Sequence, residues 1–278
     1  MAGIVCQHVR NFSSSSGRRI FSPNLWRHCP LDIINAGATD YVGFSDDFIS
    51  GPASWADATY EQHYTTDQDT GVTVTTGTDV ENGTLVIAGN DGGNDFGTVR
   101  RGGATSGPFV IPDGSGGHPL WFEARIKVAS ITATYNAFFI GLGEAGMVGN
   151  DAAITDTTGV PKVLDLIGFS KLSADGEVDI VYTKASGALQ TLATGVGTMV
   201  ADTYMNLGFY YNPDALSTKR ITFYVDNVEC NTYVTRTLQD DGTNFPGGEE
   251  LNAVLATKNA ASAASAYTLD WWACYQLG

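Results

Sequence analysis

A strict alternation of apolar and polar side chains over nine residues is the feature that most limits how this chain can fold. Within Leu120–Val128 every even-numbered residue is apolar, whereas the odd-numbered positions hold Trp, Glu, Arg and Lys. The same period of two recurs in Met205–Tyr211 and in Ile221–Val225. Because successive side chains of a strand point to opposite faces, these segments are predicted to be antiparallel strands with one buried face.

Turn signals separate these segments, and helix signals are scarce. Asn and Asp tolerate the left-handed backbone that a tight hairpin turn demands. The turn dipeptides are Asn82-Gly83, Asp113-Gly114, Asp175-Gly176, Asp226-Asn227 and Asp241-Gly242. The stretch Ala253–Ala266 is alanine-rich, but we expect a loop at Asn259–Ser265, because the small residues there lack an apolar stripe. Many strands with short turns predict an all-β fold, a two-sheet antiparallel jelly-roll sandwich.

The charge of the chain is divided unevenly between its start and the rest. The first 30 residues hold four arginines and no acid, which leaves 11 of the 15 basic residues and all 30 acidic residues to the remainder. This asymmetry predicts an extended basic N-terminal arm, residues 1–40, on a single sandwich domain, residues 41–278. An acidic domain argues against a nucleic-acid partner, and the lack of a long apolar run argues against a membrane span or a signal peptide.

The arm is predicted to bind a partner. Ser13–Ser16 reads as a flexible hinge, and an arm without its own core must bury Phe21 and Trp26 on some other surface. The residues expected to make these contacts are Arg10, Arg18, Arg19, Phe21, Trp26 and Arg27. The alternative is that the arm packs back onto its own domain.

The glycine-rich stretch Gly89–Gly117 is expected to be a long surface excursion with short strands at Asp95–Arg101 and Pro108–Ile111. Its Asn and Asp residues could hold calcium, but such clusters most often only make turns. The four cysteines are widely spaced and show no zinc-ligand pattern, so we expect free thiols. No cofactor and no metal is predicted.

Several strands together resemble those of the concanavalin A-like jelly rolls of the laminin-G and glucanase superfamily. The resemblance covers roughly residues 44–276. It is carried by Asp46-Asp47-Phe48, Leu120–Val128, Phe138–Gly143, Val200–Tyr211, Arg220–Val228 and Tyr267–Tyr275. It implies that the last strand returns to pair with the first. The low charge and the Thr, Gly and Ala tracts look most like jelly-roll structural proteins of tailed bacteriophage virions.

One strand is similar to the catalytic strand of the laminarinase-type hydrolases of this superfamily, which reads Glu-x-Asp-x-x-Glu. Glu177 and Asp179 match this motif, but Tyr182 takes the place of the acid/base carboxylate. A retaining mechanism needs two carboxyl groups. We therefore interpret Glu177 and Asp179 as solvent-facing strand residues. Neither His63 nor His118 lies in a sequence pattern typical of a catalytic triad. We expect no enzymatic activity.

Sugar sites stack aromatic rings on the faces of the sugar. By the alternation pattern, the candidates for outward aromatic residues are Trp121, Tyr210, Tyr224 and Trp272. Outward aromatic residues can equally cover protein contacts.

Two functions are compatible with these features. The preferred hypothesis is a non-enzymatic phage capsid decoration or cement protein. Its arm would anchor it to the major capsid protein or another virion protein, and it would act as a dimer or trimer on the capsid surface after synthesis in the host cytoplasm. The alternative is a lectin-like module of a phage head or tail fibre that reads host glycans.

Overall fold

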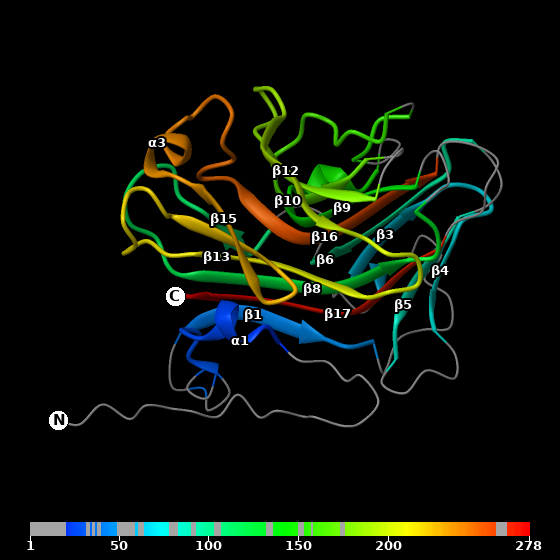
Figure 1. Ribbon diagram of the computed structural model, residues 1–278, viewed down its shortest axis with the longest axis horizontal. Helices are drawn as coiled ribbons and strands as arrows, with labels where there is room; N and C mark the ends of the chain where they lie inside the picture. The colour runs from blue at the N-terminus through cyan, green and yellow to red at the C-terminus, as the bar shows by residue number, and fades with distance from the viewer. Residues whose placement is uncertain are drawn as a thin grey trace.

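The computed structural model describes 14 stretches of the chain. These are residues 21–31, 34, 37, 40–48, 59–60, 64–77, 83–89, 93–102, 107–131, 136–149, 153–156, 158–172, 176–259 and 266–278. The fold is the predicted all-β sandwich of two antiparallel sheets, which lie one above the other in Figure 1.

The lower layer in Figure 1 is an eight-stranded sheet, here called sheet A. Its order is β15 (Val228–Val234), β14 (Ile221–Val225), β13 (Met205–Tyr211), β8 (Leu120–Val128), β17 (Ala266–Leu277), β5 (Leu85–Ala88) and β4 (Thr73–Thr76), with β1 (Tyr41–Asp46) also paired to β17.

The upper layer is a nine-stranded sheet, here called sheet B. Its order is β12 (Gln190–Thr198), β11 (Glu177–Thr183), β10 (Leu166–Lys171), β9 (Asn136–Gly143), β16 (Glu250–Asn259), β6 (Phe96–Arg101), β3 (Tyr64–Gln68) and β2 (Thr59–Tyr60), with β7 (Phe109–Val110) paired to β16. The strands expected in the glycine-rich stretch are therefore present as β6 and β7.

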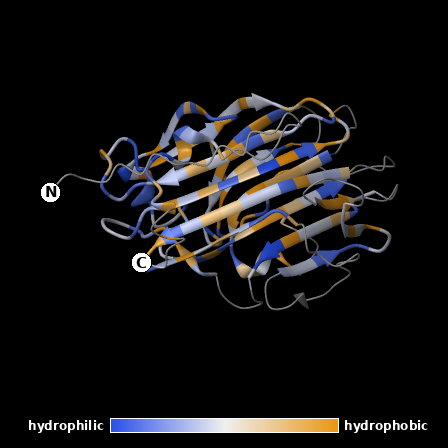
Figure 2. Cartoon of the chain, turned by 90° about the horizontal axis from the view of Figure 1, so that it is seen from below, coloured by the Kyte–Doolittle hydropathy of each residue, from blue (hydrophilic) through white to orange (hydrophobic). Residues whose placement is uncertain are grey.

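The alternation that predicted the strands also builds the core. The even-numbered residues of β8 are fully buried between the sheets, where they meet apolar residues of sheet B such as Phe138 and Phe169. Figure 2, which views the molecule from the side of α1 and β1, shows hydrophilic and hydrophobic residues alternating along several strands. Burial of one face of each sheet is the main source of stability in such a sandwich.

Two local predictions are confirmed by the backbone. Asp226 and Asn227 both have positive φ, 48° and 67°, and join β14 to β15 in the tight turn that their sequence predicts. The last strand does return to the first, because Phe44 of β1 pairs with Cys274 of β17.

A bulge in β17 changes which of its side chains face the core. The register with β8 shifts between Leu269 and Trp271, so that one extra residue enters β17. Residues after the bulge consequently reverse their faces, and Trp272 packs in the core while Trp271 faces outward. The pattern-based prediction that Trp272 faces outward is therefore wrong.

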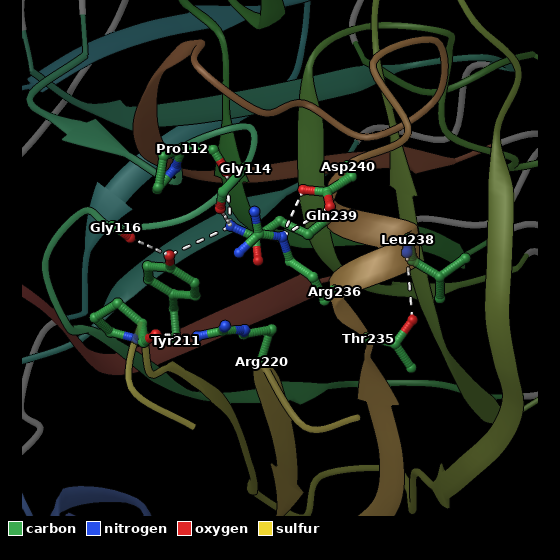
Figure 3. A network of polar contacts seen from close by, with 11 residues as sticks. Pro112, Gly114, Gly116, Tyr211, Arg220, Thr235, Arg236, Leu238, Gln239 and Asp240 are labelled. Atoms are coloured by element: carbon green, nitrogen blue, oxygen red, sulfur yellow. Dashed lines mark hydrogen bonds and ion pairs between the residues drawn. The ribbon is translucent and has the colours of Figure 1, made fainter. Parts of the chain in front are cut away.

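A small polar network fixes one end of the sandwich (Figure 3). The helix α3 (Arg236–Gln239) carries Gln239, which is fully buried. Its amide donates hydrogen bonds to the carbonyl oxygens of Pro112 and Gly114, at 2.8 and 3.0 Å. The Tyr211 hydroxyl donates to the Gly116 carbonyl at 2.7 Å. These bonds tie the 112–116 loop to α3 and β13.

No helix within the described stretches has both the length and the apolar character to cross a membrane. Among the described residues the thiols of Cys29, Cys230 and Cys274 are free, and Cys6 lies outside these residues.

Candidate functional site

The segment that precedes β1 lies against the outer face of sheet A. We call residues 21–31 together with Ile34 the strap; it contains the short helix α1 (Pro23–Trp26), which lies below β17 and β8 in Figure 1. Its apolar side chains form a cluster with outward residues of the sheet. The buried members are Leu25, Trp26, Ile34, Trp121, Ala273 and Tyr275.

Aromatic contacts hold the strap in place. The Trp26 side chain, only 1% exposed, meets Tyr275 edge-on with ring centroids 5.9 Å apart. Phe21 contacts both Trp26, at 5.0 Å, and the outward Trp271, at 4.9 Å. Such pairs add stability beyond the area they bury.

A buried carboxylate anchors the strap. Glu123 of β8 is fully buried and accepts hydrogen bonds from the Ser22 backbone N–H at 3.0 Å and the Trp26 indole N–H at 2.6 Å. The Ser22 hydroxyl and the Asn206 amide also contact this carboxylate. Burial raises the pKa of Glu123 to about 7, although its hydrogen bonds favour the charged form.

A second anchor joins the strap to the hairpin turn. The Asn24 backbone N–H and side-chain amide donate to the side chain and the backbone carbonyl of Asn227, both at 2.8 Å. Gly208 of β13 allows the close approach, because a Cβ atom there would lie 2.5 Å from a methyl group of Leu25. The position of α1 on sheet A is thus fixed at both of its sides.

This arrangement corrects the picture of a free arm for the residues that the structure describes. The side chains of Phe21 and Trp26 find their burial on the chain's own sheet, which was the alternative left open by the sequence. Arg27 is exposed. Arg10, Arg18, Arg19 and the serine hinge lie outside the described residues.

Beside the strap lies an open groove of about 570 Å³, which we call the strap groove. One wall is the strap, and the other is formed by β13, β14 and the 212–219 loop. The lining residues are Asn24, Arg27, His28, Tyr210, Asn212, Ala215, Leu216, Lys219, Thr222, Tyr224 and Glu229. Two of the predicted glycan-binding residues and one predicted arm residue therefore meet in a single groove.

The two tyrosines of the strap groove are half-buried. The Tyr210 ring stacks on Trp121, with centroids 5.0 Å apart and planes 13° from parallel. Burial raises the pKa of Tyr210 to about 12, with a further contribution from Asp214, and burial raises that of Tyr224 as well. Both phenols therefore keep their protons at neutral pH and can donate hydrogen bonds.

The other two aromatic candidates do not reach solvent. Trp121 does face outward, as its strand pattern predicts, but the strap and Tyr210 cover it to 1% exposure. Trp272 is 0% exposed between the sheets, because the bulge turns it inward. Neither side chain offers a free ring face to a ligand in this structure.

A smaller groove of about 340 Å³ borders the strap near Ser22 and Pro23. It also includes Arg125, which forms an ion pair with Asp270 and lies 4.2 Å from the centroid of the Tyr204 ring. Arg125 is already in an ion pair and Asp226 already accepts a hydrogen bond from the Asn206 N–H, so the strap groove is the better candidate for a site.

Other predicted sites have ordinary surroundings. Glu177 is exposed on β11, and Asp179 accepts a hydrogen bond from the Gly195 N–H at 2.9 Å. Lys184, just after the end of the same strand, forms an ion pair with Glu249 at 2.9 Å. His63, Asn90 and Asp91 lie outside the described residues, and the part of the chain that the structure covers contains no group of three potential metal-ligating side chains.

Several residues in or near the candidate site could not be found from the pattern. Glu123 reads as a solvent-facing strand residue, and nothing local to it signals that a segment about 100 residues earlier covers it. Asn24 and His28 reach the groove only through docking of the strap. The exposed Leu216, at 74%, borders the groove but has no sequence signal of its own.

Comparisons with known proteins identify the fold. No protein-family model matches the chain, and no curated protein sequence matches it. Among solved structures, peanut lectin is similar with a TM-score of 0.57 and 12% identity over 85% of this chain and 97% of the lectin. An endo-1,3-beta-glucanase from Streptomyces sioyaensis is similar with a TM-score of 0.57 and 15% identity, over 86% of this chain and 97% of the glucanase. The carbohydrate recognition domain of Emp47p is similar with a TM-score of 0.52 and 12% identity, over 84% of this chain and 95% of that domain.

These structures correct one expectation and leave others open. We expected no enzymatic activity, but a glucanase shares this fold, and the fold is therefore compatible with catalysis. A virion role, a capsid partner, a dimer or trimer and a location on the capsid are addressed by none of these comparisons and stay predictions. What the likeness shows is the fold: the chain is a concanavalin A-like jelly roll of the kind that lectins and glucanases also have.

Proposed function

We propose that this protein binds carbohydrate in the strap groove. The observation that carries the proposal is the meeting, in one open groove, of two half-buried tyrosines and a rim of polar side chains. Aromatic side chains cover the apolar faces of sugar rings, and the surrounding polar groups bind their hydroxyls. The groove volume lies within the range of roughly 300–1,000 Å³ that small-molecule sites occupy.

The groove retains free hydrogen-bonding capacity. Tyr210, Thr222 and Tyr224 make no side-chain hydrogen bond with any other described residue, so their hydroxyls are open to a ligand. The Trp121 stack and the two strap anchors hold the walls in place before binding. A preformed site loses less conformational entropy when it binds. The shared fold with peanut lectin and the Emp47p domain supports the same proposal.

A glycan screen followed by calorimetry tests this proposal. We expect saturable binding of at least one oligosaccharide, and a loss of affinity of about tenfold in each of the variants Tyr210→Ala and Tyr224→Ala. Tyr41→Ala is the control, because Tyr41 is an exposed tyrosine of sheet A that lies outside the groove. Absence of saturable binding across the screen, or equal losses in all three variants, would contradict the proposal.

The same mixtures should be analysed for cleavage products, because the fold is shared with a glucanase. Products that form with the wild type would show that binding is part of a catalytic cycle. A ligand recovered intact would show that binding is the whole activity under those conditions.

A further inference from the structure

The charge of the strap groove differs in sign from that of the chain. The chain has a formal net charge of −15. Among the described residues of the groove lining, Arg27 and Lys219 are cations, and Glu229 is the single carboxylate. From this contrast we propose that the ligand is an acidic oligosaccharide, one that bears carboxylate or sulfate groups. The inference rests on the proposed carbohydrate binding and narrows its substrate class.

The one carboxylate of the lining is already neutralised. Glu229 accepts a hydrogen bond from the Tyr233 hydroxyl and forms an ion pair with Lys219 at 3.4 Å. The Lys219 ammonium group also lies 4.1 Å from the centroid of the Tyr233 ring. Lys219 and Glu229 therefore balance each other on the β14–β15 side of the groove.

The cation on the strap side, Arg27, has no such partner. Arg27 and His28 are exposed, and neither forms a side-chain hydrogen bond or ion pair with any residue for which the structure gives a placement. An unpaired guanidinium presents a planar set of donors that fits a carboxylate or a sulfate. The net excess of positive charge thus comes from the wall that the strap supplies.

The position of this wall is set by contacts outside the groove. Arg27 directly follows Trp26, whose indole is bonded to the buried Glu123. Asn24 is bonded to Asn227 on the opposite side of α1. The backbone at Arg27 is therefore held over the groove before a ligand arrives. Asp214 of the 212–219 loop also contributes to the raised pKa of Tyr210, but it does not line the groove.

Matched pairs of oligosaccharides test the inference. The probes are hexasaccharides of galacturonate, glucuronate and mannuronate, each beside its carboxyl-reduced form, and a sulfated galactan hexasaccharide beside its desulfated form. We expect at least one acidic member to bind about tenfold more tightly than its neutral counterpart. The preference should shrink as salt rises from 50 to 300 mM, because salt screens exposed charges. Comparison of the uronate probes with the sulfated probe shows whether the groove binds carboxylate or sulfate groups.

The variant Arg27→Gln should remove most of this preference, and Arg27→Lys should restore part of it. Arg236→Gln is the control, because Arg236 is an arginine of α3 already bonded to Asp240 and lies outside the groove. Binding of neutral forms with equal affinity, still lost in Tyr224→Ala, would overturn the inference and leave carbohydrate binding intact. Absence of binding to every probe and to the wider screen would overturn both.

Discussion

The two outer faces of the sandwich are covered in different ways. Sheet B is covered by the segment that joins its own strands β9 and β10, whose residues Met147, Ala153 and Ile154 pack on Phe139 and Val254. Sheet A is covered by the strap, which comes from the start of the chain. The strap, laid across sheet A from a distant part of the chain, borders a groove on either side.

The polar groups beneath the two covers have opposite sign. On sheet B, Arg100 and Lys258 are buried cations that donate to the carbonyl oxygens of Ala145 and Ile154. On sheet A, Glu123 is a buried acid that accepts from the N–H groups of the strap. Each cover thus satisfies one kind of buried charge, as buried charges require. The difference predicts that the two faces respond differently to mutation and to pH.

The largest expected effect is that of Trp26→Ala. Removing this indole from the strap should lower the free energy of unfolding by about 3–5 kcal/mol, measured by urea denaturation, because it leaves a cavity and removes a donor from Glu123. Phe139→Ala on sheet B should cost a similar amount. Only Trp26→Ala should also abolish ligand binding. Equal loss of binding in both variants would mean that the groove does not depend on the strap.

The next effect is a pH dependence of stability from Glu123. Its pKa is raised from an ordinary 4.5 to about 7 because burial disfavours the carboxylate. The folded protein holds this proton more tightly than the unfolded chain, so this contribution is complete below pH 4.5 and is lost as the pH rises through 7. The contribution of this raised pKa to the free energy of unfolding amounts to about 3 kcal/mol.

The comparison with Glu123→Gln isolates this contribution. The difference in unfolding free energy between wild type and variant should change between pH 4.5 and 8, with the wild type losing stability relative to the variant as pH rises. Glu177→Gln, at an exposed position of sheet B, should run parallel to the wild type. A Glu123→Gln curve parallel to that of the wild type would show that the strap does not bury a titrating group.

A smaller loss is expected for Lys258→Met on sheet B. This change keeps the apolar stem but leaves the Ile154 carbonyl and Asp156 without the ammonium group, at a cost of about 1–3 kcal/mol. Differential scanning calorimetry would measure it, and ligand affinity should stay within twofold of the wild type. A large loss of affinity would place the site on sheet B rather than beside the strap.

The smallest effect on stability is expected for Tyr224→Ala. Tyr224 is half-buried at the rim of the strap cluster, so its removal should change the unfolding free energy by about 1 kcal/mol or less. A loss of ligand binding in this variant would then not be caused by a loss of folding. A drop in stability as large as that of Trp26→Ala would show that Tyr224 supports the strap instead of a ligand.

The sequence predicted the sandwich because its signals are local. The period of two in β8, β13 and β14 and the Asp226-Asn227 turn each depend on a few adjacent residues. The face of Trp272 was mispredicted because a bulge inserts one residue that is visible only in the pairing of β17 with β8.

The candidate site could be predicted only in separate pieces. Tyr210, Tyr224 and Arg27 were singled out, but for two different functions. More than 180 residues separate Arg27 from the tyrosines, and a pattern within one strand says nothing about a segment that docks from such a distance. The burial of Glu123 was missed for the same physical reason.

The most direct test of the account is a crystal structure of the full chain with its tightest-binding oligosaccharide. We expect sugar rings in the strap groove, in contact with Tyr210 and Tyr224 and with an acidic substituent at Arg27. Sugar bound on the outer face of sheet B, or in the smaller groove beside Tyr204, would contradict it.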